Sequence, residues 1–230
     1  MAKKTRKVLG ILFLLTAVVF SQIPMPVAFA ANAVEDFQRD ESTLVEYTGT
    51  ATAVSVPDTV EKIGAEAFAK NIDIGTVNVG KNTKEIDTSA FAECKYLTTV
   101  TLPDKVESLG DFVFSGCEYL SKVTIGEKVE EIGEGAFAGC NSLSTLQIDK
   151  KNTNFSLNKG ALYDAKEETL IAYLNGYASD SYNMPDSVKE IYKYAFWGNE
   201  NIEYVHFSSY LEEIPGYAFS NCRNLRQGFV

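Results

Sequence analysis

Histidine is almost absent from this sequence, which has a single one, His206, among 230 residues. A Ser-His-Asp triad, a Cys-His pair and a multi-histidine metal centre all need histidine beside specific partners. The patterns G-x-S-x-G, H-E-x-x-H and G-x-x-x-x-G-K-[ST] are missing as well. We therefore predict a protein that is not an enzyme, with no catalytic residues, no cofactor and no metal.

A hydrophobic run long enough to cross a bilayer is also lacking. The apolar run at residues 8–20 has 13 residues, against roughly 20 for a spanning helix. It follows the basic residues 3–7 and precedes Ala28, Phe29 and Ala30, which is the pattern of a secretory signal peptide with a small-residue cleavage site. We predict a signal peptide at residues 1–30, cleavage after Ala30, a secreted or cell-surface protein, and no membrane span in the mature chain.

Basic residues are scarce. The chain has 21 Lys and Arg against 31 Asp and Glu, and four of the basic residues lie in the leader. The mature chain is therefore strongly acidic, and it would repel phosphates instead of neutralising them. This argues against nucleic acid as a partner.

What the sequence does contain is a repeat, which is registered best on six phenylalanines. They are Phe68, Phe91, Phe114, Phe137, Phe196 and Phe219, with successive steps of 23, 23, 23, 59 and 23 residues. An apolar residue stands five positions before each, and a pattern L-x-x-V-x-L/I follows, as in Leu143, Leu146 and Ile148. A constant step of this length is typical of a solenoid.

The physical interpretation of one repeat is one coil of the solenoid. Alternate apolar residues in L-x-x-V-x-L/I predict a short strand that lies about 4.8 Å from its equivalent in the next coil. The V-x-x-I piece predicts a second extended segment, and the Ala-Phe pair predicts one helical or 3-10 turn on the opposite side. The fold class is therefore a stack of short parallel strands with short helical or 3-10 turns opposite them.

The signature I-G-x-x-A-F-x-x-C-x-x-L-x-x-V-x-I resembles the BspA-like leucine-rich repeats of secreted bacterial and protozoan surface proteins. The resemblance covers about residues 44–230 and is seen most clearly from Ile132 to Ile148. It implies a right-handed leucine-rich-repeat solenoid that is exported and acts in adhesion to, or recognition of, host or neighbouring-cell macromolecules. It implies no catalytic residues. Departures include Asn71 and Asn199 in place of Cys, and Gly228 in place of an apolar residue.

The pattern divides the chain into segments. After the leader we expect a flexible lead-in at 31–42, an N-terminal cap hairpin at 43–56, and repeats at 57–148. A long coil at 149–184 contains a hairpin at 160–173 that we expect to project from the stack. Further repeats at 185–230 end in mid-repeat at Val230 without a polar cap, which suggests a fragment of a longer protein.

The four cysteines are candidates for disulfides because export permits them. Cys94, Cys117 and Cys140 occupy one repeat position in neighbouring coils, about 5 Å apart, whereas Cys222 is too far from them to pair. Buried free thiols are the simpler interpretation. A line of thiols also does not surround a point as zinc ligands must.

The outward strand positions are the candidate binding site. They are polar and nearly uncharged: Thr99, Thr101, Lys122, Thr124, Thr145, Gln147, Tyr204 and His206. The β-propensity of threonine would explain them without any function, and a concave docking surface is the functional interpretation. A column of glutamates around the V-x-x-I piece suggests a solvated side, since no D-x-D-x-D-G calcium loop accompanies it.

The sequence therefore favours a secreted or surface-displayed leucine-rich-repeat binding module for an extracellular protein or glycan. The alternative is a structural spacer, the solenoid portion of a larger exported protein whose C-terminal domain, catalytic or anchoring, lies beyond Val230.

Overall fold

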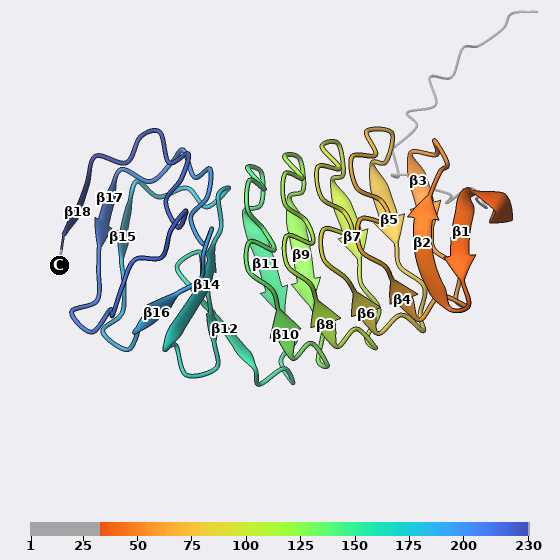
Figure 1. Ribbon diagram of the computed structural model, residues 1–230. Coiled ribbons are helices and arrows are strands. Elements are labelled where there is room, and N and C mark those ends of the chain that lie inside the picture. The colour runs from red at the N-terminus through yellow and green to blue at the C-terminus, as the bar shows by residue number, and fades with distance from the viewer. Residues whose placement is uncertain (1–32, 230) are drawn as a thin grey trace, which may run out of the picture.

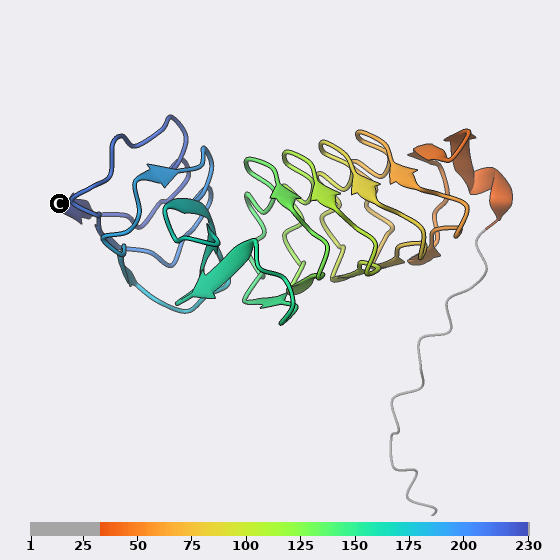
Figure 2. The same cartoon turned by 90° about the horizontal axis from the view of Figure 1, so that it is seen from below.

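The computed structural model describes residues 33–229, and in it the chain winds as a solenoid whose coils stand side by side (Figure 1). The view from below shows the same row of coils running from β1 to the C-terminal end (Figure 2). The expected signal peptide and Val230 lie outside the described residues. Within the described part, no helix is long and apolar enough to cross a membrane.

One wall of each coil is a short parallel strand. The strands of this first sheet are β3 (Ala53–Ser55), β5 (Thr76–Asn78), β7 (Thr99–Thr101), β9 (Lys122–Ile125) and β11 (Thr145–Ile148), paired in that order. Their central residues, such as Val77, Val100 and Val123, are buried while the flanking residues point outward. This is the expected strand of the L-x-x-V-x-L/I pattern. Each residue pairs with the residue at the same repeat position in the next coil, 23 positions later.

A second sheet forms from the V-x-x-I pieces. Its strands are β1 (Phe37–Asp40), β2 (Thr43–Tyr47), β4 (Lys62–Ile63), β6 (Glu85–Ile86), β8 (Ser108–Leu109) and β10 (Glu131–Ile132), again in that order. Each two-residue strand buries one isoleucine or leucine and exposes its polar neighbour to a greater degree. In the N-terminal coils, two walls are therefore β-structure.

The third wall, here called the turn wall, runs from two residues before to three residues after each repeat phenylalanine. Tight turns alternate with bonds between coils: the Ala69 N–H donates to Glu66 O at 2.8 Å, and the Phe68 N–H donates to Ala90 O of the next coil at 2.8 Å. The i→i−3 bonds that we expected are present, but no helix forms here. A continuous helix would keep its N–H groups inside the coil and leave none for the neighbouring coil.

Left-handed backbone makes this alternation possible. Positive φ recurs two residues before each repeat phenylalanine, at Glu66, Ser89, Phe112, Gly135, Tyr194 and Tyr217, and two residues after it, at Lys70, Glu93, Gly116, Gly139, Gly198 and Asn221. Each positive φ interrupts the right-handed turn of the backbone, so the turns do not continue into a helix. The one helix among residues 33–229 is the three-residue 3-10 helix η1 (Val34–Asp36).

The core is a ladder of stacked side chains between the three walls. Phe68, Phe91, Phe114 and Phe137 stack ring on ring, with centroids 4.8, 5.6 and 6.0 Å apart. Leucine, valine and isoleucine columns surround them. Every coil therefore adds the same apolar slice to its neighbour.

The expected cap hairpin at 43–56 is wrong in its position. The hairpin is β1–β2, which turns at Glu41 and pairs Asp40 with Thr43, whereas β2 and β3 belong to different sheets. Residues 43–56 form the first coil, because Leu44 and Val54 are both fully buried as its two wall strands. Most of the expected lead-in at 31–42 is thus part of the cap.

The long coil does contain a hairpin, but the hairpin does not project. Strands β12 (Phe155–Asn158), β13 (Ala161–Asp164) and β14 (Thr169–Tyr173) form an antiparallel meander. Both hairpin strands are buried because their alternate residues serve two cores: Leu162 and Ile171 join the N-terminal cluster, while Tyr163 and Leu170 join the C-terminal one. The meander is a partition inside the stack.

The C-terminal coils resume the pattern on the other side of the partition. Strand β14 pairs in parallel with β16 (Glu190–Ile191), and β15 (Ser181–Asn183) pairs with β17 (Tyr204–His206), which pairs with β18 (Gln227–Phe229). Tyr173 stacks on Phe196 at 5.0 Å, and its N–H bonds to Ala195 O. Ala172 and Tyr173 are therefore the Ala-Phe pair of the long coil.

Candidate functional site

Six of the eight candidate residues lie together on the first sheet. We call this surface the polar strand face, and it consists of Thr99, Thr101, Lys122, Thr124, Thr145 and Gln147 on β7, β9 and β11. Lys122 lies between Thr99 and Thr145, and Thr124 pairs with Gln147. All six side chains are exposed, since the residue between each outward pair fills the core.

The other two candidates lie elsewhere. Tyr204 and His206 are exposed on β17, whose neighbours are β15 and β18 instead of β11. The partition formed by the long coil interrupts the first sheet between these two groups. The sequence pattern correctly predicted that both residues point outward, but it did not predict that they belong to a separate sheet.

The polar strand face is almost neutral. Lys122 is its one charged member, and threonine hydroxyls and the Gln147 amide can each both donate and accept hydrogen bonds. Such groups suit a polar uncharged ligand surface better than a strongly charged one.

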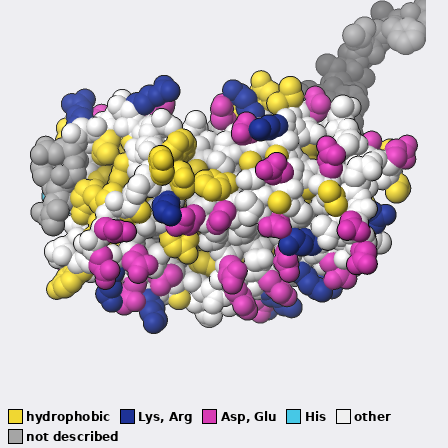
Figure 3. Space-filling view, in the orientation of Figure 1, with side chains coloured by type: hydrophobic (Ala, Val, Ile, Leu, Met, Phe, Trp, Pro, Cys, Tyr) yellow, Lys and Arg dark blue, Asp and Glu magenta, His cyan; other side chains and the backbone are white. Residues whose placement is uncertain are grey.

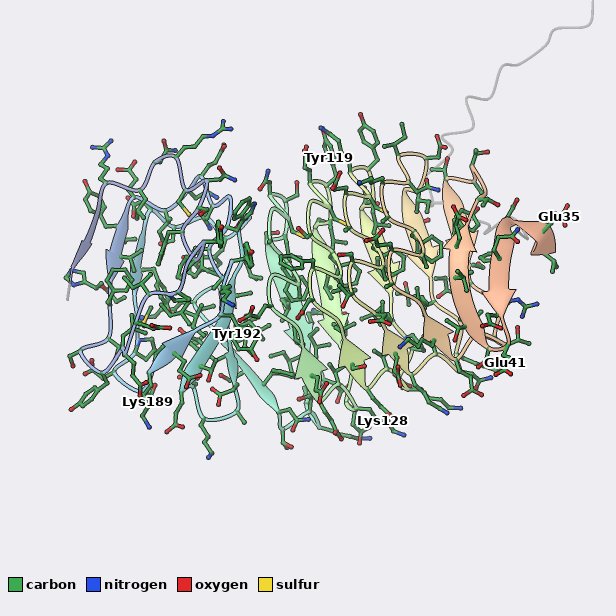
Figure 4. The ribbon with its side chains drawn as sticks, viewed as in Figure 1. Glu35, Glu41, Tyr119, Lys128, Lys189 and Tyr192 are labelled. Atoms are coloured by element: carbon green, nitrogen blue, oxygen red, sulfur yellow. The ribbon has the colours of Figure 1, made fainter. Side chains whose placement is uncertain are left out.

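Two tyrosines beside this face were missed at the sequence level. Tyr96 and Tyr119 are each 50% exposed and stack on one another with ring centroids 5.7 Å apart. They stand three residues before Thr99 and Lys122, so they border the polar strand face within about 10 Å of chain. Figure 4 shows Tyr119 at the edge of the molecule. The recurrence of Tyr at one repeat position was the available signal.

The second sheet carries an acidic groove of about 670 Å³. Its carboxylates are Glu85, Asp87, Asp111, Glu130, Glu131, Glu134 and Asp164. Phe155 of the long coil and Tyr192 of the C-terminal coils also line it. Figure 4 shows Tyr192 where the C-terminal coils meet the N-terminal ones. In the space-filling view, acidic side chains gather in the lower half of the molecule, where Figure 1 draws β6, β8 and β10 (Figure 3).

Ion pairs offset part of this charge. The Lys62 ammonium lies 2.9 Å from Asp87 and 3.2 Å from Glu85. The contact with Lys62, together with the Thr88 N–H, lowers the pKa of Asp87, and the same carboxylates raise the pKa of Lys62. Within residues 33–229, no three His, Cys, Asp or Glu side chains are grouped so that they could hold a metal ion.

The cysteines have a structural role in the turn wall. Cys94, Cys117 and Cys140 are fully buried and unbridged, and each thiol donates to the carbonyl of a repeat phenylalanine 26 residues earlier, at 2.9–3.1 Å. Burial raises the pKa of Cys94 and of Cys140 to about 12. Thiols held in the neutral form do not act as nucleophiles.

The repeat geometry agrees with a comparison against protein families. Residues 42–165 and 172–229 match the BspA type Leucine rich repeat region in six copies. The chain belongs to this family. The unmatched residues 166–171 span the turn of the partition hairpin and the start of β14.

Several solved structures have a similar fold. A leucine-rich repeat protein from Eubacterium ventriosum is similar with a TM-score of 0.62 at 16% identity, covering 81% of this chain and 65% of that one. The pneumococcal vaccine antigen PcpA has a TM-score of 0.57 at 19% identity, covering 83% and 64%. A Treponema pallidum leucine-rich repeat protein has a TM-score of 0.54 at 20% identity, covering 86% and 83%.

These likenesses concern the fold. The chain spans slightly less than two thirds of the length of the first two structures. No curated protein sequence matches it.

Proposed function

We propose that this protein is a secreted or surface-displayed binding module that recognises an extracellular protein or glycan through the polar strand face. It acts by surface complementarity and not by catalysis. Export is supported by the leader pattern in residues 1–30.

The observation that carries the proposal is the register of β7, β9 and β11. Lys122 is flanked by Thr99 and Thr145 at equivalent positions, and the strands repeat about every 4.8 Å. Four of the six side chains are threonines, which are short and stiff and stand beside buried neighbours, so these four lose little conformational entropy when a ligand covers them. Tyr96 and Tyr119 add exposed aromatic surface of the kind that often anchors interfaces.

A binding assay with the mature chain tests the proposal. Residues 31–230 are immobilised and exposed to extracellular-matrix proteins and to cell-wall polysaccharide, and binding is measured by surface plasmon resonance. The double variant Thr101→Glu/Thr124→Glu places two carboxylates in the middle of the face without touching the core. We expect it to weaken binding at least tenfold.

The matched control is Ser187→Glu/Ser209→Glu, which adds the same charge at two exposed positions outside this face. It should bind like the unmodified protein. Equal loss in both double variants would show that net charge, and not the polar strand face, governs binding. A folded chain that binds none of these materials would contradict the proposal itself.

A further inference from the structure

A second hollow lies on the turn wall, where the repeats pass the long coil. It has a volume of about 260 Å³, and an adjoining hollow of about 150 Å³ shares Asn141, Gly198 and Glu200 with it. Trp197, the single tryptophan of the chain, lines the larger one. We call the two together the Trp197 groove. Their combined size reaches the lower end of the ~300–1,000 Å³ of small-molecule sites.

The floor of the groove is open because three glycines recur where other coils carry side chains. Gly116, Gly139 and Gly198 occupy the left-handed position that is Lys70 and Glu93 in the first repeats. A Cβ on Gly198 would lie 3.6 Å from the Cα of Gly139, although 59 residues separate them in the sequence. The coils on either side of the long coil therefore meet directly at this floor.

The long coil contributes a buried amide side chain to this groove. Asn175 is only 6% exposed, and its Nδ2 donates to Trp197 O at 2.9 Å and to Asn141 Oδ1 at 3.3 Å. No described residue donates to its Oδ1, although the side chain lines the smaller hollow. The Asn201 Nδ2 bonds to Asn175 O at 2.7 Å, which holds the neighbouring amide in place. The Asn175 amide is therefore held in place by its Nδ2 bonds, and its oxygen remains available in the hollow to accept a hydrogen bond from a ligand hydroxyl group.

The charges of the groove cancel. Glu118 pairs with Lys95 at 2.9 Å, and Glu200 pairs with Arg223 at 3.5 Å. The groove is therefore unsuited to an ionic ligand. Its amides and carboxylates offer adjacent donors and acceptors, while the partly exposed indole of Trp197 offers apolar surface.

Vicinal hydroxyls on one side and C–H groups on the other are the chemistry of a pyranose ring. We propose that the Trp197 groove binds a neutral sugar residue, with the ring against Trp197 and hydroxyls bonded to Asn141, Asn175 and Glu200. The proposal rests on the extracellular setting of the proposed function, but it is independent of the polar strand face, which lies on another wall.

Trp197 itself provides the measurement, since its emission reports on this groove alone. The mature chain is titrated with galactose, mannose, glucose, N-acetylglucosamine and their β-linked disaccharides, with excitation at the red edge of the indole band. We expect a saturable change with at least one sugar, with a dissociation constant in the millimolar range typical of single sugar residues. Gly139→Lys, which copies Lys70 into the floor, should weaken this binding at least tenfold.

Gly216→Lys is the control, because a Cβ there meets nothing within 4 Å and lies outside the groove. It should titrate like the unmodified chain. Circular dichroism establishes that both variants are folded. No response to any of the sugars at several tens of millimolar would overturn the proposal, as would a response that survives Gly139→Lys. Binding through the polar strand face is measured separately, so either proposal can fail while the other stands.

Discussion

The left-handed residues of the turn wall set a conformational cost at single positions. Lys70 has φ +62° and makes no ion pair with the described residues, while three later coils place glycine at the same position. Left-handed backbone costs an L-residue ~1–2 kcal/mol, and a glycine avoids this cost. Glycine in turn loses ~0.5–1 kcal/mol of stability because it has more conformational freedom in the unfolded chain. We expect Lys70→Gly to raise the free energy of unfolding by ~0.5–1 kcal/mol, measured by urea denaturation.

Lys128→Gly is the comparison for this change. Lys128 is an exposed turn residue without a positive φ, so the same substitution there removes no strain. It should leave the protein equally stable or less stable. A gain at both positions would mean that removal of positive charge, or of a side chain in general, is responsible.

The thiols also lead to a prediction at single residues. Because Cys94, Cys117 and Cys140 are fully buried with raised pKa values, iodoacetamide at pH 8 should leave them unmodified in the native protein. Cys222 is partly exposed and should react first. Mass spectrometry should find four labelled cysteines after denaturation without reductant. Fewer than four would reveal a disulfide and contradict the unbridged ladder.

At the scale of elements, the partition hairpin depends on one buried polar contact. The hydroxyls of Tyr163 on β13 and Tyr182 on β15 bond to each other inside the C-terminal core. Removing one of them leaves the other unsatisfied, so Tyr163→Phe or Tyr182→Phe should each cost ~1–3 kcal/mol of unfolding free energy. The double variant should cost clearly less than the sum, because no unpaired hydroxyl remains. Additive losses would show that the two hydroxyls act independently.

The same pair has a pH dependence. Burial raises the pKa of Tyr163 to about 12 and raises that of Tyr182 as well. The neutral phenols are thus favoured by folding, and their stabilisation is fully present below the unfolded pKa of ~10. It is lost as the pH rises toward 12. Between pH 10 and 12, the free energy of unfolding should therefore fall less for the double Phe variant than for the unmodified chain, as measured by denaturation followed by circular dichroism.

How far the sequence predicts these elements depends on whether a residue repeats. Phe91, Val100 and Ile86 recur at a constant step, so their strands, their burial and the family follow from the spacing alone. The turn wall was predicted less well, since a short Ala-Phe segment carries no period of its own and the left-handed positions accept Glu, Lys and Tyr as well as Gly. The prediction that the hairpin projects was wrong for a similar reason. Tyr173 takes the place of the repeat phenylalanine, and only tertiary packing shows that both faces of the hairpin are covered.

The candidate sites show the same limit. The outward direction of Thr101 and Lys122 follows from strand alternation, but their separation from Tyr204 and His206 depends on the partition. The Trp197 groove joins Gly139 to Gly198, which no local pattern places together. Contacts across the long coil are set by how far its extra residues displace the backbone, and this is a property of the folded stack.

At the scale of the whole molecule, the partition lies between two hydrophobic cores and contributes side chains to both. Coils in a solenoid are stabilised by their immediate neighbours, so cooperativity passes along the stack only through each interface. Leu162 and Ile171 join the N-terminal cluster, while Tyr163 and Leu170, on the same two strands, join the C-terminal one. The meander is thus the apolar layer between the two clusters, and it acts beside direct contacts such as Phe112 with Tyr194 and the Gly139 N–H with Trp197 O.

This coupling can be weakened at the partition itself. Leu162→Ala removes a fully buried side chain on the N-terminal face of the partition and should cost ~2–5 kcal/mol. Trp197 reports on the C-terminal cluster, and hydrogen exchange of residues 76–125 reports on the N-terminal one. In the unmodified chain the two should unfold together in urea. In Leu162→Ala the C-terminal coils, which are fewer, should unfold at lower urea than the N-terminal coils.

Leu120→Ala is the matched control, since Leu120 is equally buried but lies in the middle of the N-terminal stack. It should cost a similar free energy of unfolding. It leaves the contacts of the partition intact, so the C-terminal coils, followed by Trp197, should not unfold at lower urea than the N-terminal coils. If Leu162→Ala lowers both transitions equally, the direct contacts of Phe112 with Tyr194 and of Gly139 with Trp197 join the two sets of coils more strongly than the partition does. The interface between neighbouring coils, and not the hairpin, would then carry cooperativity across the long coil.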